Sequence, residues 1–363
     1  MKVVILFTAS AILFQNVSCD AFQQQRIRVV VAPLRHGLPR SIPNVSFVNA
    51  HDQRNAVGIK NNHIAFRGGS RASNMMDPNI IETVSFNNGP LQLSSIIFSA
   101  INLLGFFISL FTGSHIHLDL LGSGAFAAAS LPTLLSSSSP TRVMVSSGAV
   151  ALWGTKLASF LFFRALKVKT DVRLEDTLGT VSGTATFWFI SLFWGLICSL
   201  PHTLGTTSSL KGNPITLCLG FVLYLLGLAT ETKADYQKWM FKQSNPGKFC
   251  NEGLWSISQH PNFFGNLLLW LGIFVMNADS LIEPVKENGG FFSTLLGSWR
   301  VWVALLSPAF IWSLFQGQAT GSVTNSLELA NQKYGSDATY NAYIKNVPLI
   351  VPRILDWLKQ LFS

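Results

Sequence analysis

A short polar stretch, residues 253–266, stands directly before an apolar run that continues to Val275. It reads GLWSISQHPNFFGN and is rich in side chains that donate or accept hydrogen bonds. Polar groups at the entrance of a membrane-length segment meet both water and lipid. Such a place suits the binding of a polar cofactor head beside an apolar substrate. The candidate cofactor-binding residues in this stretch are Ser258, Gln259, His260, Asn262 and Asn266.

The order of these residues predicts where a helix begins. Pro261 forces an extended backbone on His260 and is favoured at the first position of a helix. Asn262 then lies in the first turn, and Asn266 lies one turn further along the same face. His260 is the one side chain in residues 253–278 that titrates near neutral pH. A purely structural alternative is that His260 or Asn262 caps the helix.

Composition indicates a membrane protein. The chain has 363 residues, of which 48% are hydrophobic and 12% are charged, with a mean hydropathy of +0.36. Soluble domains contain about 25% charged residues. The net charge of +9 comes mostly from residues 1–75, which hold nine Lys and Arg against Asp20 and Asp52. This distribution argues against a nucleic-acid partner. None of the four cysteines forms a C-x-x-C pair, so we expect neither a disulfide nor a metal site.

Apolar runs of membrane-spanning length predict an all-α, polytopic helix bundle with about seven transmembrane helices. The basic segments 164–173 and 233–248 follow the third and fifth spans, so they are expected on one side of the membrane, facing cytosol or stroma. Lys156 falls in the middle of the third span, where a cation must face the bundle or a wet cavity. The predicted spans are 93–112, 116–136, 143–164, 178–200, 213–231, 262–278 and 301–318.

The first 75 residues have the composition of a targeting presequence. Residues 1–20 read as a signal peptide, with Lys2 followed by a short apolar run. Residues 21–75 are rich in Arg, Asn and Ser and poor in acidic residues, as disordered transit peptides are. A signal followed by such a segment resembles the presequence of algae with complex plastids. A plastid membrane is therefore expected, and the alternative is the endoplasmic reticulum with a disordered tail. The membrane domain is expected over residues 93–363.

Residues 253–266 resemble the signature of the DUF1295 group, in the steroid 5-alpha-reductase C-terminal superfamily, which reads roughly G-L-W-x-x-S-R-H-P-N-Y-x-G-E. Three positions differ: Gln259 stands for Arg, Phe263 for Tyr and Asn266 for Glu. The resemblance covers about residues 95–355. Three more segments resemble the family in the same order along the chain, namely residues 164–173, 231–242 and 307–343.

The resemblance implies a membrane reductase of the 3-oxo-5-alpha-steroid 4-dehydrogenase type, using NADPH on a lipophilic steroid-, isoprenoid- or enoyl-like substrate. It implies that Asp235 and Lys242, seven residues apart on one helical face, help hold the dinucleotide. Hydride addition to an enone also needs an acid, for which Tyr224 and Glu231 are the candidates. Two alternatives remain, a non-catalytic lipid-binding protein of the same fold and an S-adenosylmethionine-dependent methyltransferase of the isoprenylcysteine type.

Overall fold

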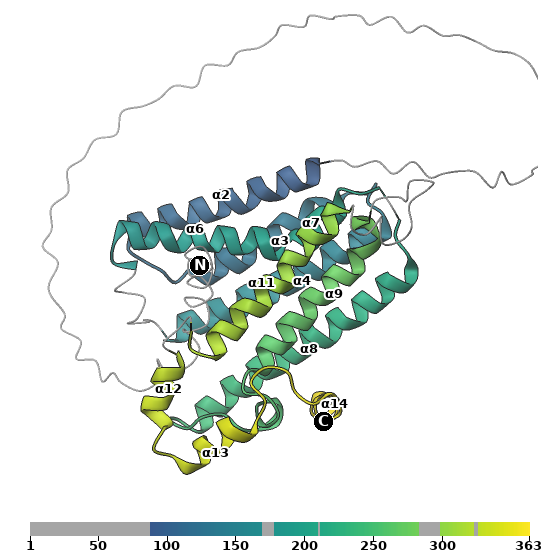
Figure 1. Ribbon diagram of the computed structural model, residues 1–363. Helices are drawn as coiled ribbons and strands as arrows, with labels where there is room; N and C mark the ends of the chain where they lie inside the picture. The colour runs from purple at the N-terminus through teal and green to yellow at the C-terminus, as the bar shows by residue number, and fades with distance from the viewer. Residues whose placement is uncertain (1–87, 169–177, 210, 283–297, 323–325) are drawn as a thin grey trace, which may run out of the picture. The chain divides into compact units, whose positions relative to one another are not determined.

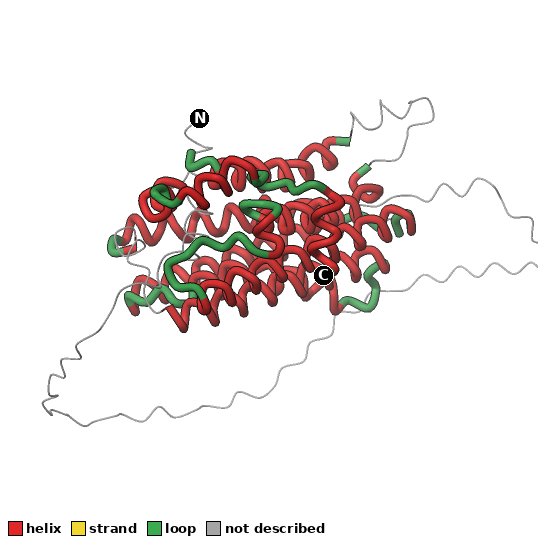
Figure 2. Tube along the Cα trace, turned by 90° about the horizontal axis from the view of Figure 1, so that it is seen from below, coloured by secondary structure: helices red, strands yellow, loops and turns green. Residues whose placement is uncertain are grey.

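A computed structural model describes residues 88–168, 178–209, 211–282, 298–322 and 326–363. The predicted signal peptide and transit-like segment lie outside these residues. Every regular element of the described chain is a helix, which confirms the predicted all-α class (Figures 1 and 2). The elements of the membrane bundle are α2 (Gly89–Thr112), α3 (Leu118–Leu135), α4 (Thr141–Val168), α6 (Val181–Cys198), α7 (Leu200–Thr206), α8 (Pro214–Ser244), α9 (Pro261–Leu281) and α11 (Trp299–Ala319).

Shorter elements lie at one end of this bundle. They are the 3-10 turn η1 (Gly253–Ser256) before α9, and the C-terminal helices α12 (Ser326–Tyr334), α13 (Ala338–Asn346) and α14 (Ile354–Phe362). Figure 1 shows α12 and α13 beside the end of α8 and the start of α9. The residues that follow the apolar part of α8 therefore meet a segment that is about 90 residues further along the chain.

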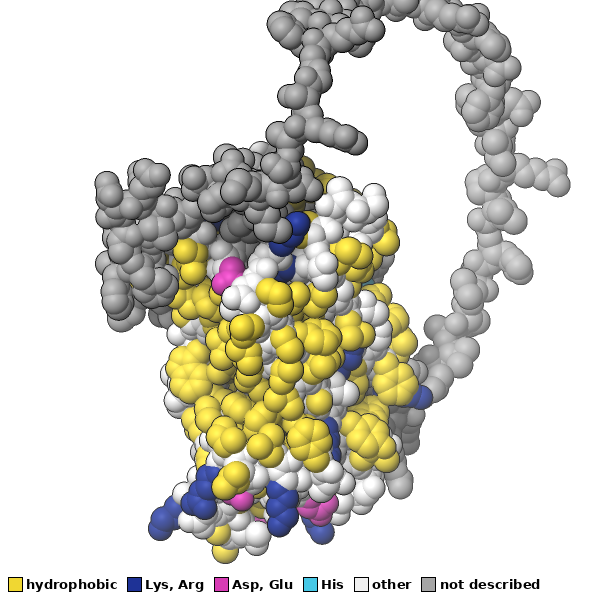
Figure 3. Space-filling view, turned by 90° about the vertical axis from the view of Figure 1, so that its right-hand side faces the viewer, with side chains coloured by type: hydrophobic (Ala, Val, Ile, Leu, Met, Phe, Trp, Pro, Cys, Tyr) yellow, Lys and Arg dark blue, Asp and Glu magenta, His cyan; other side chains and the backbone are white. Residues whose placement is uncertain are grey.

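Six of the described helices are long and apolar enough to cross a membrane, namely α2, α3, α4, α6, α8 and α9. The seventh predicted span is also a helix, α11, which is not one of these six. Figure 3 shows apolar side chains over most of one side, with Lys and Arg at the lower end, where Figure 1 places α12 and α13. Large exposed apolar residues such as Phe111 and Leu219 match a lipid-facing surface.

Helix α8 continues well past the end predicted for it. The apolar pattern stops at residue 231, but the helix continues to Ser244. Residues 228–243 contain neither Pro nor Gly, and Ala, Glu, Lys, Gln and Met among them are strong helix formers. One rigid element therefore joins the inside of the bundle to its surface.

Helices α8 and α9 run antiparallel and approach each other through glycine residues. Gly220 and Gly227 on α8, and Gly265 and Gly272 on α9, are each seven residues apart. A Cβ added to Gly265 or Gly272 would lie 2.5 Å from the backbone nitrogen of Glu231 or Tyr224, respectively. Small residues of this kind let membrane helices pack backbone to backbone.

We expect Gly272→Ala to lower the midpoint of thermal unfolding in detergent. The added methyl group meets backbone atoms that cannot move aside, so α8 and α9 must separate. Such overpacking costs about 1–3 kcal/mol, more than the gain of about 1 kcal/mol when Ala replaces a helical Gly. The matched control is Gly124→Ala, whose new Cβ would be 3.9 Å from the Cβ of Ala158. The close contact at Gly272 is contradicted if the unfolding midpoint of Gly272→Ala equals or exceeds that of Gly124→Ala.

Candidate functional site

Four charged residues form a stripe along one face of α8. Glu231, Asp235, Lys238 and Lys242 are separated by four, three and four residues, the spacing that aligns side chains on a helix. Glu231 lies in the apolar part of the helix, and Lys242 is the third residue from its C-terminal end. The stripe therefore leads from the interior of the bundle to the surface where α12 and α13 lie.

The inner end of the stripe is a charged cluster between α4, α8 and α9. The Lys156 Nζ lies 3.3 Å from Glu231 Oε2 and 3.4 Å from Asp235 Oδ2. Trp153 Nε1 donates to Glu231 Oε2 at 3.1 Å, and Asn266 Nδ2 donates to Glu231 Oε1 at 2.8 Å. Lys156 thus faces the bundle, as its position in an apolar run requires. The Asn266 amide donates a hydrogen bond to Glu231. The Glu that the resembling signature has at position 266 would instead repel Glu231, because both carboxylates carry negative charge.

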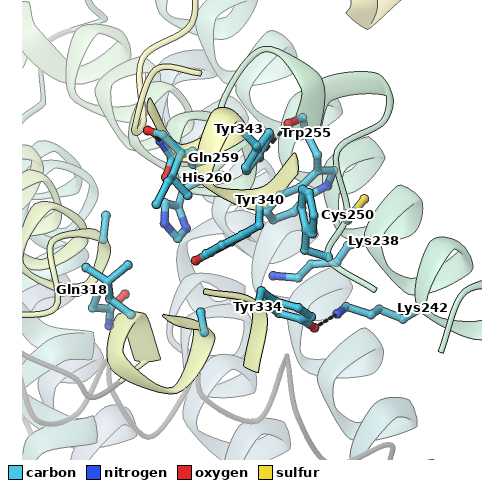
Figure 4. A pocket seen from close by; sticks show the side chains of 15 residues that line it. Lys238, Lys242, Cys250, Trp255, Gln259, His260, Gln318, Tyr334, Tyr340 and Tyr343 are labelled. Atoms are coloured by element: carbon cyan, nitrogen blue, oxygen red, sulfur yellow. Dashed lines mark hydrogen bonds between the residues drawn. The ribbon is translucent and has the colours of Figure 1, made fainter. Parts of the chain in front are cut away.

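The outer end of the stripe enters a pocket of about 160 Å³ between the ends of α8 and α11, η1, α12 and α13 (Figure 4). Five aromatic residues line it, namely Phe249, Trp255, Tyr334, Tyr340 and Tyr343. Its polar lining consists of Lys238, Lys242, Gln259, His260 and Gln318. The Lys238 Nζ lies 4.3 Å from the centre of the Trp255 ring, and the Lys242 Nζ donates to the hydroxyl of Tyr334 at 3.0 Å.

His260 lies at the N-terminal end of α9 and lines the pocket. It occupies the capping position, but its side chain makes no capping hydrogen bond. Its ring instead stacks on Phe263, with the ring centres 4.6 Å apart. Burial, and to a lesser extent the charge of Lys238, lowers the pKa of His260 to about 3. The imidazole is therefore neutral at physiological pH and can both donate and accept a hydrogen bond.

Two of the predicted cofactor-binding residues hold the C-terminal segment in place. Ser258 Oγ donates to the carbonyl oxygen of Ile350 at 2.7 Å. Gln259 Nε2 donates to the carbonyl oxygens of Ile344 and Val347, at 3.0 and 2.7 Å. Gln259 also lines the pocket, so this residue both docks α13 and contributes to the site.

The remaining predicted residues are placed apart from the pocket lining. The Tyr224 hydroxyl donates to the carbonyl oxygen of Ala149 at 2.7 Å, inside the bundle. Asn262 lies in the first turn of α9, and its Oδ1 is buried without a hydrogen-bond partner among the described residues. Asn266 and Glu231 meet in the charged cluster. In the described part of the chain, no three His, Cys, Asp or Glu side chains group as metal ligands would.

Gln318 is a pocket residue that the sequence reasoning missed. It is the second-last residue of α11 and is only 4% exposed. Neither Nε2 nor Oε1 of its amide has a hydrogen-bond partner among the described residues. A Gln at the end of an apolar run looks like an ordinary span boundary, so no local signal marks it.

We expect Lys156→Met to destabilise the protein by up to about 3–5 kcal/mol, because the buried carboxylate of Glu231 and the half-buried carboxylate of Asp235 lose a counter-charge. Lys156→Arg, which keeps the charge, should cost less. Replacing both carboxylates as well, with Glu231→Gln and Asp235→Asn, should restore part of the loss. Unfolding in detergent measures the effect. Equal midpoints for the wild type and Lys156→Met would rule out the charged cluster as a stabilising contact.

Comparison with known proteins supports one family. Neither the curated proteins nor the solved structures contain a match to this chain. The model of one family, described as a protein family of unknown function, DUF1295, matches residues 105–347. This match covers most of the membrane bundle, η1, the pocket and α13, and it confirms the resemblance of the signature at residues 253–266. The chain is a member of the DUF1295 family.

Proposed function

We propose that this protein is a membrane-embedded reductase that uses NADPH to reduce a lipophilic substrate with a conjugated carbon–carbon double bond. The observation that carries the proposal is the stripe on α8. It joins a basic, aromatic pocket at the surface of the bundle to a charged cluster among apolar helices. A cofactor with a phosphorylated adenosine at one end and a reactive ring at the other suits such an arrangement.

The residues of the pocket fit a dinucleotide phosphate. Lys238 and Lys242 supply positive charge for phosphate groups. The aromatic walls offer flat faces for rings, and the neutral His260 supplies a donor and an acceptor. Both polar atoms of the Gln318 amide lack a partner within the described ranges, and a ligand would supply one.

The inner end of the stripe fits the reactive end of the cofactor. When bound, NADPH supplies a hydride. The carboxylates of Glu231 and Asp235 can accept hydrogen bonds from a carboxamide, and the ammonium of Lys156 can stabilise negative charge on a nearby oxygen. Trp153 connects this cluster to an aromatic core that includes Phe126 and Trp270. The surroundings are therefore apolar enough for a lipophilic substrate.

We also propose that the protein resides in a plastid membrane, with the endoplasmic reticulum as the alternative. The support is the signal-like start of the chain and the acid-poor, Arg-rich segment that follows it. A fluorescent protein fused after residue 90 should accumulate in the plastid. Retention of this fusion in the endoplasmic reticulum would remove the plastid assignment and leave the reductase proposal untouched.

We expect NADPH, and not S-adenosylmethionine, to raise the thermal unfolding midpoint of the detergent-solubilised protein. Lys242→Ala should weaken NADPH binding about tenfold to a hundredfold, because a hydrogen bond to a charged group contributes about 1.5–3 kcal/mol. The matched control is Lys211→Ala, an exposed lysine that does not line the pocket.

The same assay separates the alternatives. Stabilisation by S-adenosylmethionine instead of NADPH would favour the methyltransferase. A response to neither cofactor at millimolar concentration would reject the reductase and favour a non-catalytic lipid-binding protein. If Lys242→Ala and Lys211→Ala bind NADPH with equal affinity, the cofactor binds elsewhere on the chain.

A further inference from the structure

The side-chain amide of Gln318 is a buried polar group without a partner in the described part of the chain. Its Nε2 and Oε1 are both shielded from solvent, and neither is hydrogen-bonded. Leaving a buried donor or acceptor unsatisfied costs about 1–3 kcal/mol. The large majority of buried side-chain polar atoms in proteins are paired. A ligand in the adjoining pocket that reached this amide would supply the missing partners.

The residues around Gln318 indicate the shape of a ligand that fits the pocket. Figure 4 shows Gln318 and His260 on one side of the pocket, with Tyr334 and Lys242 on the other. The aromatic residues hold one another in place, since the Tyr340 ring centre is 5.2 Å from that of Phe249 and 5.5 Å from that of Tyr334. A flat ring can stack against such walls, and its edge can then face the amide.

The two polar atoms of the Gln318 amide indicate which hydrogen-bonding groups the edge of the ligand must carry. A glutamine amide presents a donor and an acceptor side by side, and it pairs with a ring edge that has an acceptor next to a donor. Adenine has such an edge, because its exocyclic amino group lies beside a ring nitrogen, and Gln is a residue that pairs with it through two hydrogen bonds.

We propose that Gln318 recognises the adenine base of the dinucleotide. This inference rests on the proposed function. It assigns the adenine end to the pocket because Gln318, Lys238 and Lys242 all lie at the outer end of the α8 stripe. The reactive nicotinamide ring would then lie at the inner end, among the apolar helices. Gln318 is thus a specificity-determining residue at the mouth of the site.

The test compares two halves of the cofactor, adenosine 2′,5′-bisphosphate and reduced nicotinamide mononucleotide, together with intact NADPH. Affinities are measured by thermal shift for the wild type and for Gln318→Met, which keeps the length of the side chain but removes both hydrogen-bonding atoms. The matched control is Gln316→Met, on the same helix, because Gln316 does not line the pocket.

We expect Gln318→Met to weaken adenosine 2′,5′-bisphosphate and NADPH alike, by about tenfold or more. Binding of the mononucleotide should stay unchanged, as should every affinity of Gln316→Met. The ligand-free unfolding midpoint of Gln318→Met should equal or exceed that of the wild type, because the variant removes an unsatisfied amide. This last result separates loss of recognition from loss of folding.

Three outcomes would overturn the inference. If the wild type binds NADPH, and Gln318→Met binds adenosine 2′,5′-bisphosphate with the same affinity as the wild type, the adenine assignment alone fails. If the variant weakens the mononucleotide instead, Gln318 contacts the nicotinamide end. If the wild type binds none of the three compounds, the proposed function fails together with the inference.

Discussion

The backbone contact between α8 and α9 is the constraint on which the candidate site depends. Two glycines on each helix remove the side chains that would otherwise hold the helices apart. Lipid gives membrane helices little hydrophobic reason to associate, so close packing of this kind is what fastens them together. The contact brings Asn266 within 2.8 Å of Glu231 and aligns the start of α9 with the last turns of α8. The pocket opens at that junction.

The charged cluster is costly in such a bundle, and its composition suggests a use. Two carboxylates and one ammonium lie among apolar helices, where ions are tolerated when they are paired and hydrogen-bonded. Trp153 and Asn266 supply hydrogen bonds to Glu231, in addition to the ion pair with Lys156. Apolar residues of similar volume in place of the whole cluster would often leave a bundle equally stable. The cluster also begins the stripe on α8, whose outer end lines the basic pocket.

Several signature residues act by holding the C-terminal segment against the bundle. Ser258 and Gln259 bind backbone carbonyl oxygens between residues 344 and 350, and the Tyr343 hydroxyl donates to the carbonyl oxygen of Trp255 at 2.8 Å. These bonds bring the tyrosines of α12 and α13 to the pocket wall. Replacing the usual Arg by Gln259 therefore removes a charge from the site while keeping donors for the docking.

The sequence alone determined the helical class, six of the spans, the start of α9 at Pro261 and the inward direction of Lys156. Each of these follows from a local cost, that of burying a charge, exposing an apolar run or bending the chain at proline. The tertiary structure decided which polar groups meet. Gln259 pairs with a carbonyl oxygen 88 residues away, and the Tyr224 hydroxyl donates to the carbonyl oxygen of Ala149. The Gln318 amide is buried without a partner among the residues that the structure describes. No local pattern encodes these outcomes, because each depends on how segments far apart in the chain pack together.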